Sequence, residues 1–425
     1  MSEILVLAIG RAEKPLQTAI NRLSYDIGQK IKGILLVNEA FAVTPAYRGN
    51  ESPDHFSELI IDFNNSDILE KTVVDLTKSK KIIIHCRMEE AIKDLQQVIP
   101  FLPKGTLAPS VDSLKNANEK YLTRTILQKN NSELSPKFVN IVKLADYIES
   151  MVSDFAFPVI VKPNGLHSSF FVNKCESLSE LEDALESAFT GIEKIYKRDY
   201  GTGMPSVLIE EFMEGEMFSV DSYTDSKGKT SFLPPVKVMT AAEAGKIGFY
   251  GYMYSLPSAL SADETNEAND AVNLTINSLG LTSCVAHTEL MKTNKGWKII
   301  ETGPRIGGYR QQLYESAYGI DHYYNDLTLH YNDETDTQKK WIKNSAGLTF
   351  YPDTEGEIVD ITGVSKLKSL STYYWHSVDA NICDKAVFAT NGGELSAIVI
   401  LSGSDKQQIE NDITELRNSL IIKVV

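Results

Sequence analysis

The chain is poor in cysteine and contains no long apolar run. None of its four cysteines has Cys-x-x-Cys spacing, which predicts reduced thiols in a cytoplasmic protein and neither a disulfide nor a zinc site. No run of about 18 apolar residues occurs, and residues 1–10 place an acid before a short apolar segment. We therefore expect neither export nor a membrane span. The cysteines are Cys86, Cys175, Cys284 and Cys383.

The chain also has fewer basic than acidic residues. The 425 residues include 42 Lys and Arg against 57 Asp and Glu, a formal charge of −15. Nonspecific binding to nucleic acid or to an anionic membrane needs a basic surface, so we expect neither partner. An anionic small molecule would have to be met by a local group of lysines, arginines and metal ions.

Two glutamates flank a predicted tight turn in residues 285–308. If Asn294, Lys295 and Gly296 form a three-residue hairpin loop, Glu289 and Glu301 are direct cross-strand neighbours. Like charges at that separation, about 5 Å between Cβ atoms, destabilise a sheet unless something compensates. A two-residue loop would instead place the two side chains on opposite faces.

A divalent cation would compensate the two charges. The predicted same-face neighbours of the carboxylates are apolar, where uncompensated charge is costly: Val285, Met291, Trp297 and Ile299. Mg²⁺ takes one or two protein carboxylates and completes its shell with water and nucleotide phosphates. The alternative is a solvent-facing hairpin with two unrelated glutamates. Arg305, with Gly307 and Gly308 after it, favours the metal site because it adds a permanent cation on a flexible turn.

These segments resemble a known family. Glu-x-Gly-x-Arg-x-Gly-Gly at residues 301–308 is similar to the Glu-x-Asn-x-Arg-x-Gly-Gly signature of the ATP-grasp superfamily, and Glu289 is similar to its first metal glutamate. Lys120 and Lys162 resemble its two nucleotide lysines, and residues 208–216 resemble the segment that lines its adenine pocket. The motifs occur in the family's order. Within the superfamily the chain most resembles the carboxylate-amine ligases, particularly the dipeptide-forming L-amino-acid ligases.

The resemblance implies a role for each matching residue. Glu289 and Glu301 would bind metal, and Arg305 with Glu301 would act in catalysis. The residues implied to contact ATP are Lys120, Lys162, Ser168, Ser169, Glu210, Glu211, Phe212, Met213 and Glu216. The residues implied to lie near the substrates are His287, Tyr252, Gly307 and Gly308.

The sequence departs from the family pattern at several positions. Gly303 replaces a metal-binding asparagine, and the phosphate flap at residues 164–171 ends in two phenylalanines. Glu216 is followed by Met217, so it reaches the ribose only if the register slips by one residue. Some alternatives stay open. Lys120 could be a solvated helical lysine, His287 could be a packed core histidine, and the tyrosines of residues 248–258 could be core.

The expected fold class is α/β with α+β parts, in an ATP-grasp architecture. Apolar segments alternate with helical stretches, which predicts a Rossmann-like first domain with a parallel sheet. The expected strands lie at residues 4–9, 33–37, 59–62 and 81–85. Residues 116–130 are expected to be helical. We predict three domains: residues 1–115, an ATP-grasp domain at 116–335, and a small α+β domain at 336–425. After the first strand, Gly10 and Arg11 are either a structural turn or a ligand contact.

The predicted function is ATP-dependent joining of a carboxylate and an amine, both expected to be amino acids, through an acyl phosphate. The resemblance implies ATP, Mg²⁺ or alternatively Mn²⁺, and a homodimer. Two alternatives remain: a carboxylase-like or phosphoryl-transferring enzyme of the same fold, and a nucleotide-binding protein without catalysis.

Overall fold

The computed structural model describes residues 3–44, 47, 56–165, 169–199, 205–338 and 340–425. Its first part is a four-stranded parallel sheet in the order β3-β2-β1-β4. The strands are β1 (Glu3–Ile9), β2 (Ile31–Asn38), β3 (Phe56–Ile61) and β4 (Lys80–His85). The helices that follow these strands are α1 (Lys14–Ile27), α2 (Glu39–Ala42), α3 (Ser66–Thr77) and α4 (Ile92–Val98). The predicted strands and the parallel arrangement are therefore confirmed.

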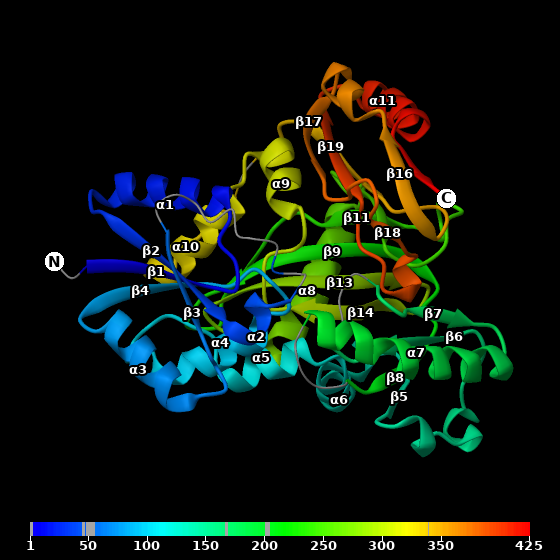
Figure 1. Cartoon of the computed structure of the whole chain (residues 1–425), viewed down its shortest axis with the longest axis horizontal. Helices are drawn as coiled ribbons and strands as arrows, with labels where there is room; N and C mark the ends of the chain where they lie inside the picture. Colours follow the sequence, from blue (N-terminus) through cyan, green and yellow to red (C-terminus); the bar gives the residue numbers. More distant parts are fainter. Residues whose placement is uncertain (1–2, 45–46, 48–55, 166–168, 200–204, 339) are drawn as a thin grey trace.

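Alternating side chains of β1 pack against helices on both faces of this sheet. Ile4 and Val6 lie in one buried cluster with α1, while Leu5 and Leu7 lie in another with α3 and α4. The first cluster also contains residues of α10 (His322–Asn332), which comes from far along the chain and runs beside α1 (Figure 1). This helix joins the first sheet to the rest of the molecule.

A second, antiparallel sheet has the order β5-β8-β6-β7. Its strands are β5 (Phe138–Ile141), β6 (Val159–Pro163), β7 (Asn173–Cys175) and β8 (Val207–Glu211). The long helix α7 (Leu178–Asp199) packs on it and supplies Leu181 and Leu185 to the shared core. In Figure 1 this sheet and helix form a separate lobe beside the central sheet.

The central sheet has nine strands, in the order β14-β13-β9-β11-β12-β15-β19-β17 with β10 paired to β9. Its strands before residue 335 are β9 (Gly215–Thr224), β10 (Thr230–Phe232), β11 (Val236–Thr240), β12 (Gly251–Leu256), β13 (Cys284–Thr293) and β14 (Gly296–Gly303). The helices around it are α5 (Val111–Asn118), α6 (Lys120–Asn130), α8 (Ala262–Leu279) and α9 (Arg310–Tyr318).

The C-terminal region continues this central sheet. Its strands β15 (Asn344–Phe350), β17 (Tyr373–Val378) and β19 (Ala397–Gly403) extend it beyond β12, and α11 (Lys406–Ser419) packs on them. A small sheet joins β16 (Gly356–Thr362), β18 (Lys385–Ala386) and β20 (Ile421–Val424). The domain limits at residues 115 and 335 stay predictions. Within the described residues, no helix combines the length and apolar character needed to cross a membrane.

Residues 116–130 are helical as expected, apart from a break at Glu119. The chain forms α5 and then α6, with an extended Glu119 (φ −99°, ψ 106°) between them. Asn164, in the loop after β6, accepts the Tyr121 amide on its side chain and the Lys120 amide on its carbonyl. The break therefore fixes the start of α6, and with it Lys120, against the end of β6.

Candidate active site

A cavity of about 470 Å³ lies where the first sheet, the smaller lobe and the central sheet meet. Most of the residues singled out in the sequence line it. Those predicted to contact nucleotide are Lys120, Lys162, Ser169, Glu210, Glu211, Phe212 and Met213. Those predicted for metal, catalysis or substrate are His287, Glu289, Glu301, Arg305 and Gly308. Segments nearly 200 residues apart in the sequence thus converge on one space.

The hairpin β13–β14 brings Glu289 directly opposite Glu301, as predicted, but by a different route. Thr293 pairs with Gly296, so the loop has two residues instead of three. A β-bulge at Ile300 then shifts the register between Leu290 and Glu289 and restores the glutamate pair. The sequence carried no visible signal for this bulge.

Because of this bulge, the predicted apolar neighbours on β14 do not lie beside the two carboxylates. Trp297 and Ile299 lie on the opposite face of the hairpin, where they pack with Leu290 and the residues of α8. The face that carries Glu289 and Glu301 lines the cavity. Of the four predicted apolar neighbours, Met291 lines the cavity with the pair, together with the charged side chains of Lys120, Lys162 and Arg305.

Lys120 is the direct cation partner of Glu301. Its Nζ lies 3.0 Å from Glu301 Oε2, and both side chains are largely buried. Burial opposes the charged form of Glu301, but Lys120 first, with Lys162 and Arg305 further away, lowers the pKa of that carboxyl to about 2. Burial likewise disfavours the Lys120 ammonium, yet Glu301 and the other acids raise its pKa overall. Lys120 is therefore not a solvated surface lysine.

Glu210 is enclosed by two cations. Its carboxylate accepts from Arg124 Nε at 2.7 Å and from Lys162 Nζ at 2.7 Å, and its side chain is only 2% exposed. Ile300, the bulged residue, turns its carbonyl to the same cations, at 2.7 Å from Arg124 Nη2 and 3.4 Å from Lys162 Nζ. Despite burial, Arg124 and Lys162 lower the pKa of Glu210. This glutamate holds the Lys162 ammonium in place at the cavity wall.

Arg124 was missed by the sequence reasoning. It lies four residues after Lys120 on α6, so both side chains share one helix face, and it is completely buried. The four-residue spacing from Lys120 could have indicated that Arg124 lies at the same site.

Arg305 has a carboxylate partner from the first sheet, which the sequence did not reveal. Its Nε donates to Glu89 Oε2 at 2.6 Å, and Glu89 lies in the loop after β4. Gly303 leaves room for this contact, because a Cβ there would lie 3.3 Å from the same Glu89 oxygen. Glu89 therefore approaches the place where the related signature has a larger side chain.

His287 connects the hairpin to a buried acid. Its Nδ1 lies 2.5 Å from Asp221 Oδ1, and its Nε2 lies 3.5 Å from Glu289 Oε1. The second Asp221 oxygen lies 3.3 Å from His322 Nε2 on α10. Burial disfavours the imidazolium, but Asp221 raises the pKa of His287 overall. The histidine is thus both packed in the core and exposed to the cavity, so it combines the two alternatives left open by the sequence.

Comparison with known proteins agrees with this geometry. Residues 155–312, which contain Lys162, both glutamates of the hairpin and Arg305, match the sequence model of the ATP-grasp domain. The chain carries an ATP-grasp domain. A curated relative is the D-alanine--D-alanine ligase of Buchnera aphidicola subsp. Schizaphis graminum, 26% identical over 196 residues, which cover 44% of this chain and 56% of that ligase. The match spans less than two thirds of that relative.

Solved structures extend the likeness to the whole fold. The L-amino acid ligase from Bacillus licheniformis has a TM-score of 0.74 at 18% identity and covers 100% of both chains. The N5-carboxyaminoimidazole ribonucleotide synthetase from Thermotoga maritima has a TM-score of 0.68 at 15% identity, also over 100% of both chains. At such identities the likeness shows a shared fold, and the match of residues 155–312 identifies the ATP-grasp domain within it.

Some predicted contacts lie outside the cavity of the ATP-grasp domain. Glu216 is mostly exposed and forms an ion pair with Lys237, whereas its neighbour Met217 lines the cavity. Tyr252 is buried beside Tyr250 and lines a different cavity. Both positions correct the sequence prediction. Alternation along β9 turns Glu216 away from the cavity, whereas Tyr252 lies at a register shift in β12, which separates it from Tyr250 and Tyr254 at the cavity. Ser168 lies outside the described residues.

Gly307 does not line the cavity, but its lack of a side chain matters there. A Cβ at this position would come within 2.5 Å of His287 Nδ1 and 2.6 Å of Arg310 Cγ. The glycine therefore allows His287 and Arg310 to lie close to the same turn.

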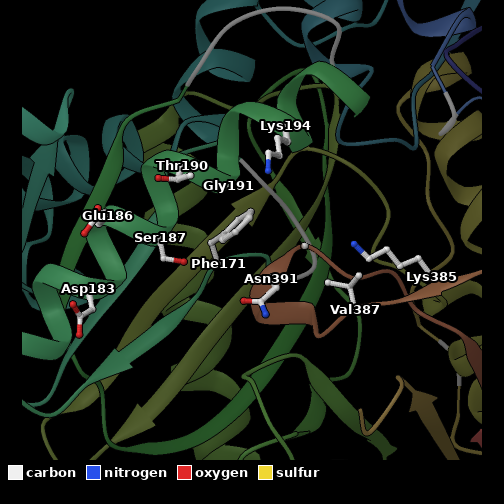
Figure 2. A pocket seen from close by; sticks show the side chains of 11 residues that line it. Phe171, Asp183, Glu186, Ser187, Thr190, Gly191, Lys194, Lys385, Val387 and Asn391 are labelled. Atoms are coloured by element: carbon white, nitrogen blue, oxygen red, sulfur yellow. The ribbon is translucent and has the colours of Figure 1, made fainter. Parts of the chain in front are cut away.

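The two phenylalanines of the predicted flap pack into the smaller lobe. Phe170 and Phe171 are 3% and 4% exposed, and a Cβ on Gly191 of α7 would come within 2.4 Å of the Phe171 ring. A second cavity of about 650 Å³ is lined by this ring together with residues of α7, Gly191 among them. Figure 2 shows the α7 side chains on one side of that cavity and Lys385 and Asn391 on the other. Both phenylalanines therefore lie in the buried cluster that α7 shares with this lobe.

The two hairpin carboxylates are suited to bind one Mg²⁺ ion together. No group of three or more His, Cys, Asp or Glu side chains among the described residues is arranged to hold a metal alone. Glu289 and Glu301 offer two hard oxygen ligands at the cavity, a donor set that fits an ion completed by nucleotide phosphates and water. Mg²⁺ would therefore bind together with ATP.

Proposed function

We propose that the protein is an ATP-dependent carboxylate-amine ligase that releases ADP and phosphate. One observation carries the proposal: Glu289 and Glu301 face one cavity with Lys120, Lys162 and Arg305. Phosphoryl transfer needs charge neutralisation and alignment more than covalent help from the protein. These five side chains supply that combination.

In the proposed reaction, a substrate carboxylate oxygen attacks the γ-phosphorus of ATP, the bond to the β-phosphate oxygen breaks, and ADP leaves. The amine nitrogen then attacks the acyl carbon, loses a proton and displaces inorganic phosphate, which forms an amide. Lys120 and Lys162 would bind the phosphates, and the planar fork of Arg305 would stabilise charge on the transferred group. Mg²⁺, or Mn²⁺ in its place, would neutralise the phosphate oxygens.

The position of Lys162 supports its role. Burial lowers the pKa of this ammonium to about 8, although Glu210 opposes the shift, so it remains charged at neutral pH. Glu210 and the Ile300 carbonyl fix the ammonium at the cavity wall before any ligand arrives. Such preorganisation reduces the reorganisation required at the transition state.

The proposed substrates are amino acids on both sides of the new bond. The names of two similar proteins, a D-alanine--D-alanine ligase and an L-amino acid ligase, support this class. Tyr254, Tyr309 and Tyr351 line the cavity and combine apolar area with hydroxyl groups, which suits an amino-acid side chain and its ammonium. A homodimer, implied by the family resemblance, stays a prediction.

The test is incubation of the full chain with ATP, Mg²⁺ and pooled amino acids. We expect ADP and phosphate in equal amounts with one new amide, detected by mass spectrometry. Release of AMP and pyrophosphate would contradict the mechanism. ATP binding without turnover on any acid and amine pair would instead support a noncatalytic nucleotide-binding protein.

A carboxylase-like reaction is the second candidate, favoured by the structural likeness to the N5-carboxyaminoimidazole ribonucleotide synthetase. Here bicarbonate would be the acid that attacks ATP. ADP release that depends on bicarbonate, and fixation of labelled carbon into an acid-labile product, would favour this candidate over amide formation.

A further inference from the structure

Arg310 is a buried arginine at the cavity that neither the sequence motifs nor the reaction described above accounts for. It is the first residue of α9, separated from the Gly307–Gly308 turn by Tyr309, and only 2% of its surface is exposed. It nevertheless lines the same cavity as Glu289 and Arg305.

The hydrogen-bond partners of Arg310 are all neutral. Its Nη2 donates to Ser219 Oγ at 2.9 Å and its Nη1 to the Gly308 carbonyl at 3.2 Å. The guanidinium carbon lies 4.4 Å from the centre of the Tyr254 ring. Among the described residues, its Nε has no hydrogen-bond partner, and none of the carboxylate ion pairs found there involves Arg310.

Other buried or half-buried arginines at this site differ in this respect. Arg124 is paired with Glu210, Arg305 with Glu89, and Arg87 with Glu13. An arginine cannot lose its charge in a protein, and a buried charge with no directly paired carboxylate is costly. Arg310 therefore has both the charge and the free donor capacity to bind an anion that enters the cavity.

The position of Arg310 also indicates which anion. Ser219, which holds its Nη2, is paired with Glu289 across the β9–β13 ladder, so the guanidinium lies beside the proposed metal pair. Lys120, Lys162 and Arg305 already face the place proposed for the phosphates. The planar fork of an arginine matches a planar carboxylate.

We propose that Arg310, supported by Tyr254 and Ser219, binds a carboxylate group of an amino-acid substrate. This inference rests on the proposed ligase function and names a substrate contact within it. The carboxylate belongs either to the acid that is activated or to the amino acid that supplies the amine. Both sources present the same chemistry to the guanidinium.

A binding experiment tests the contact without relying on turnover. The full chain with Mg²⁺ and a nonhydrolysable ATP analogue is titrated with each of the twenty common L-amino acids and with the matching amino-acid amides, and the unfolding temperature is recorded. We expect at least one amino acid to stabilise the wild-type protein, and its amide, which lacks the carboxylate, to have no effect. In Arg310→Met the amino acid should bind roughly 10- to 100-fold more weakly. Equal stabilisation by acid and amide, or no stabilisation by any amino acid, would overturn the proposal.

Two variants separate a binding role from a structural one. Arg310→Lys keeps the charge but loses the fork, so it should bind with intermediate affinity. Arg22 provides the matched control, because its guanidinium also stacks on a tyrosine, 3.8 Å from the centre of the Tyr324 ring, but it lies on α1 near Asp26 and Asp321. Arg22→Met should bind the amino acid as the wild type does. If Arg310→Met unfolds, the lysine variant and the comparison of acid with amide still decide the question.

A turnover experiment identifies the source of the carboxylate. Hydroxylamine replaces the amine substrate, because it traps an acyl phosphate as a hydroxamate and carries no carboxylate itself. If Arg310 binds the activated acid, Arg310→Met raises the KM of that acid with hydroxylamine. If it binds the amine donor, hydroxamate formation is unchanged and only the KM of the amino acid that supplies the amine rises. No change in either KM would contradict the proposal. A wild-type protein that binds an amino acid through Arg310 but never releases ADP would refute the ligase function alone.

Discussion

Glu210 and the glutamate pair of the β13–β14 hairpin line the same cavity but differ in burial and in how their charge is neutralised. Glu210 has a 2% exposed side chain and is neutralised within the chain by Arg124 and Lys162. Glu289 and Glu301 have side chains that are 24% and 27% exposed, and they are placed opposite each other. Glu210 therefore belongs to a closed structural network. The hairpin pair lines the cavity, where its more exposed carboxylates can meet a cation that arrives with a ligand.

The largest effect should come from the hairpin pair. Glu301→Gln removes one metal oxygen and the partner of Lys120, and we expect ADP release to fall roughly 100- to 1,000-fold. Arg305→Ala should give a loss of similar size. A coupled ADP assay measures both, and circular dichroism should show an unchanged fold. Near wild-type turnover in either variant would remove the proposed site.

Removing one charge should lower the free energy of unfolding at Glu210 but not at the hairpin pair. Arg124→Met leaves Glu210 with a single cation in a buried place, and we expect a loss of about 3–5 kcal/mol in the free energy of unfolding. Glu289→Gln relieves a like-charge contact, so its stability should equal or exceed that of the wild type. Urea unfolding followed by fluorescence measures both variants. A destabilised Glu289→Gln protein would mean that this glutamate is also part of a closed network.

The sequence predicted the parallel first sheet and the convergence of the lysines, glutamates and Arg305. The glutamate pair followed from hairpin geometry, because side chains on a strand alternate with a period of two. The Ile300 bulge could not be predicted, since a bulge inserts one residue without a characteristic residue type when no glycine is involved. Its value is visible only in three dimensions, where the freed carbonyl meets Arg124 and Lys162.

Contacts between distant segments account for the other omissions. Glu89 reaches Arg305 across 216 positions of the sequence, and Asp221 reaches His287 across 66. No local pattern relates either pair. In the predicted flap, the two phenylalanines could be read from the sequence, but their packing could not. The space for the Phe171 ring is provided by Gly191, which lies on the later helix α7.

A pH titration of ATP-analogue binding tests Lys162, the lysine that is paired with Glu210. The Lys162 ammonium, with a pKa of about 8 instead of 10.5, is charged below pH 8 and loses its proton as the pH rises through that value. The affinity for an ATP analogue should fall above pH 8, by up to about tenfold per pH unit. Equilibrium binding from pH 6.5 to 9.5 measures this, and Lys162→Arg, which keeps its charge, should show no such fall.

The same shift has a consequence for stability with the opposite sign. Between pH 8 and 10.5 the unfolded chain still holds the Lys162 proton while the folded protein has released it. The unfolded state then binds more protons, so the contribution of this lysine to the free energy of unfolding increases across that window. A steeper loss of stability in the wild type than in Lys162→Arg over the same window would contradict the assignment.

The smallest effect should come from Glu216, which was predicted to bind ribose. Its side chain is 58% exposed and paired with Lys237 on the neighbouring strand β11, outside the cavity that Met217 lines. An exposed ion pair of this kind contributes little, so Glu216→Gln should change neither stability nor the KM for ATP by more than about twofold. Steady-state kinetics with varied ATP measure the change, and Lys237→Gln serves as the matched variant. A large rise in KM for Glu216→Gln alone would show that this strand shifts by one residue when nucleotide binds, since only then could the carboxylate face the cavity.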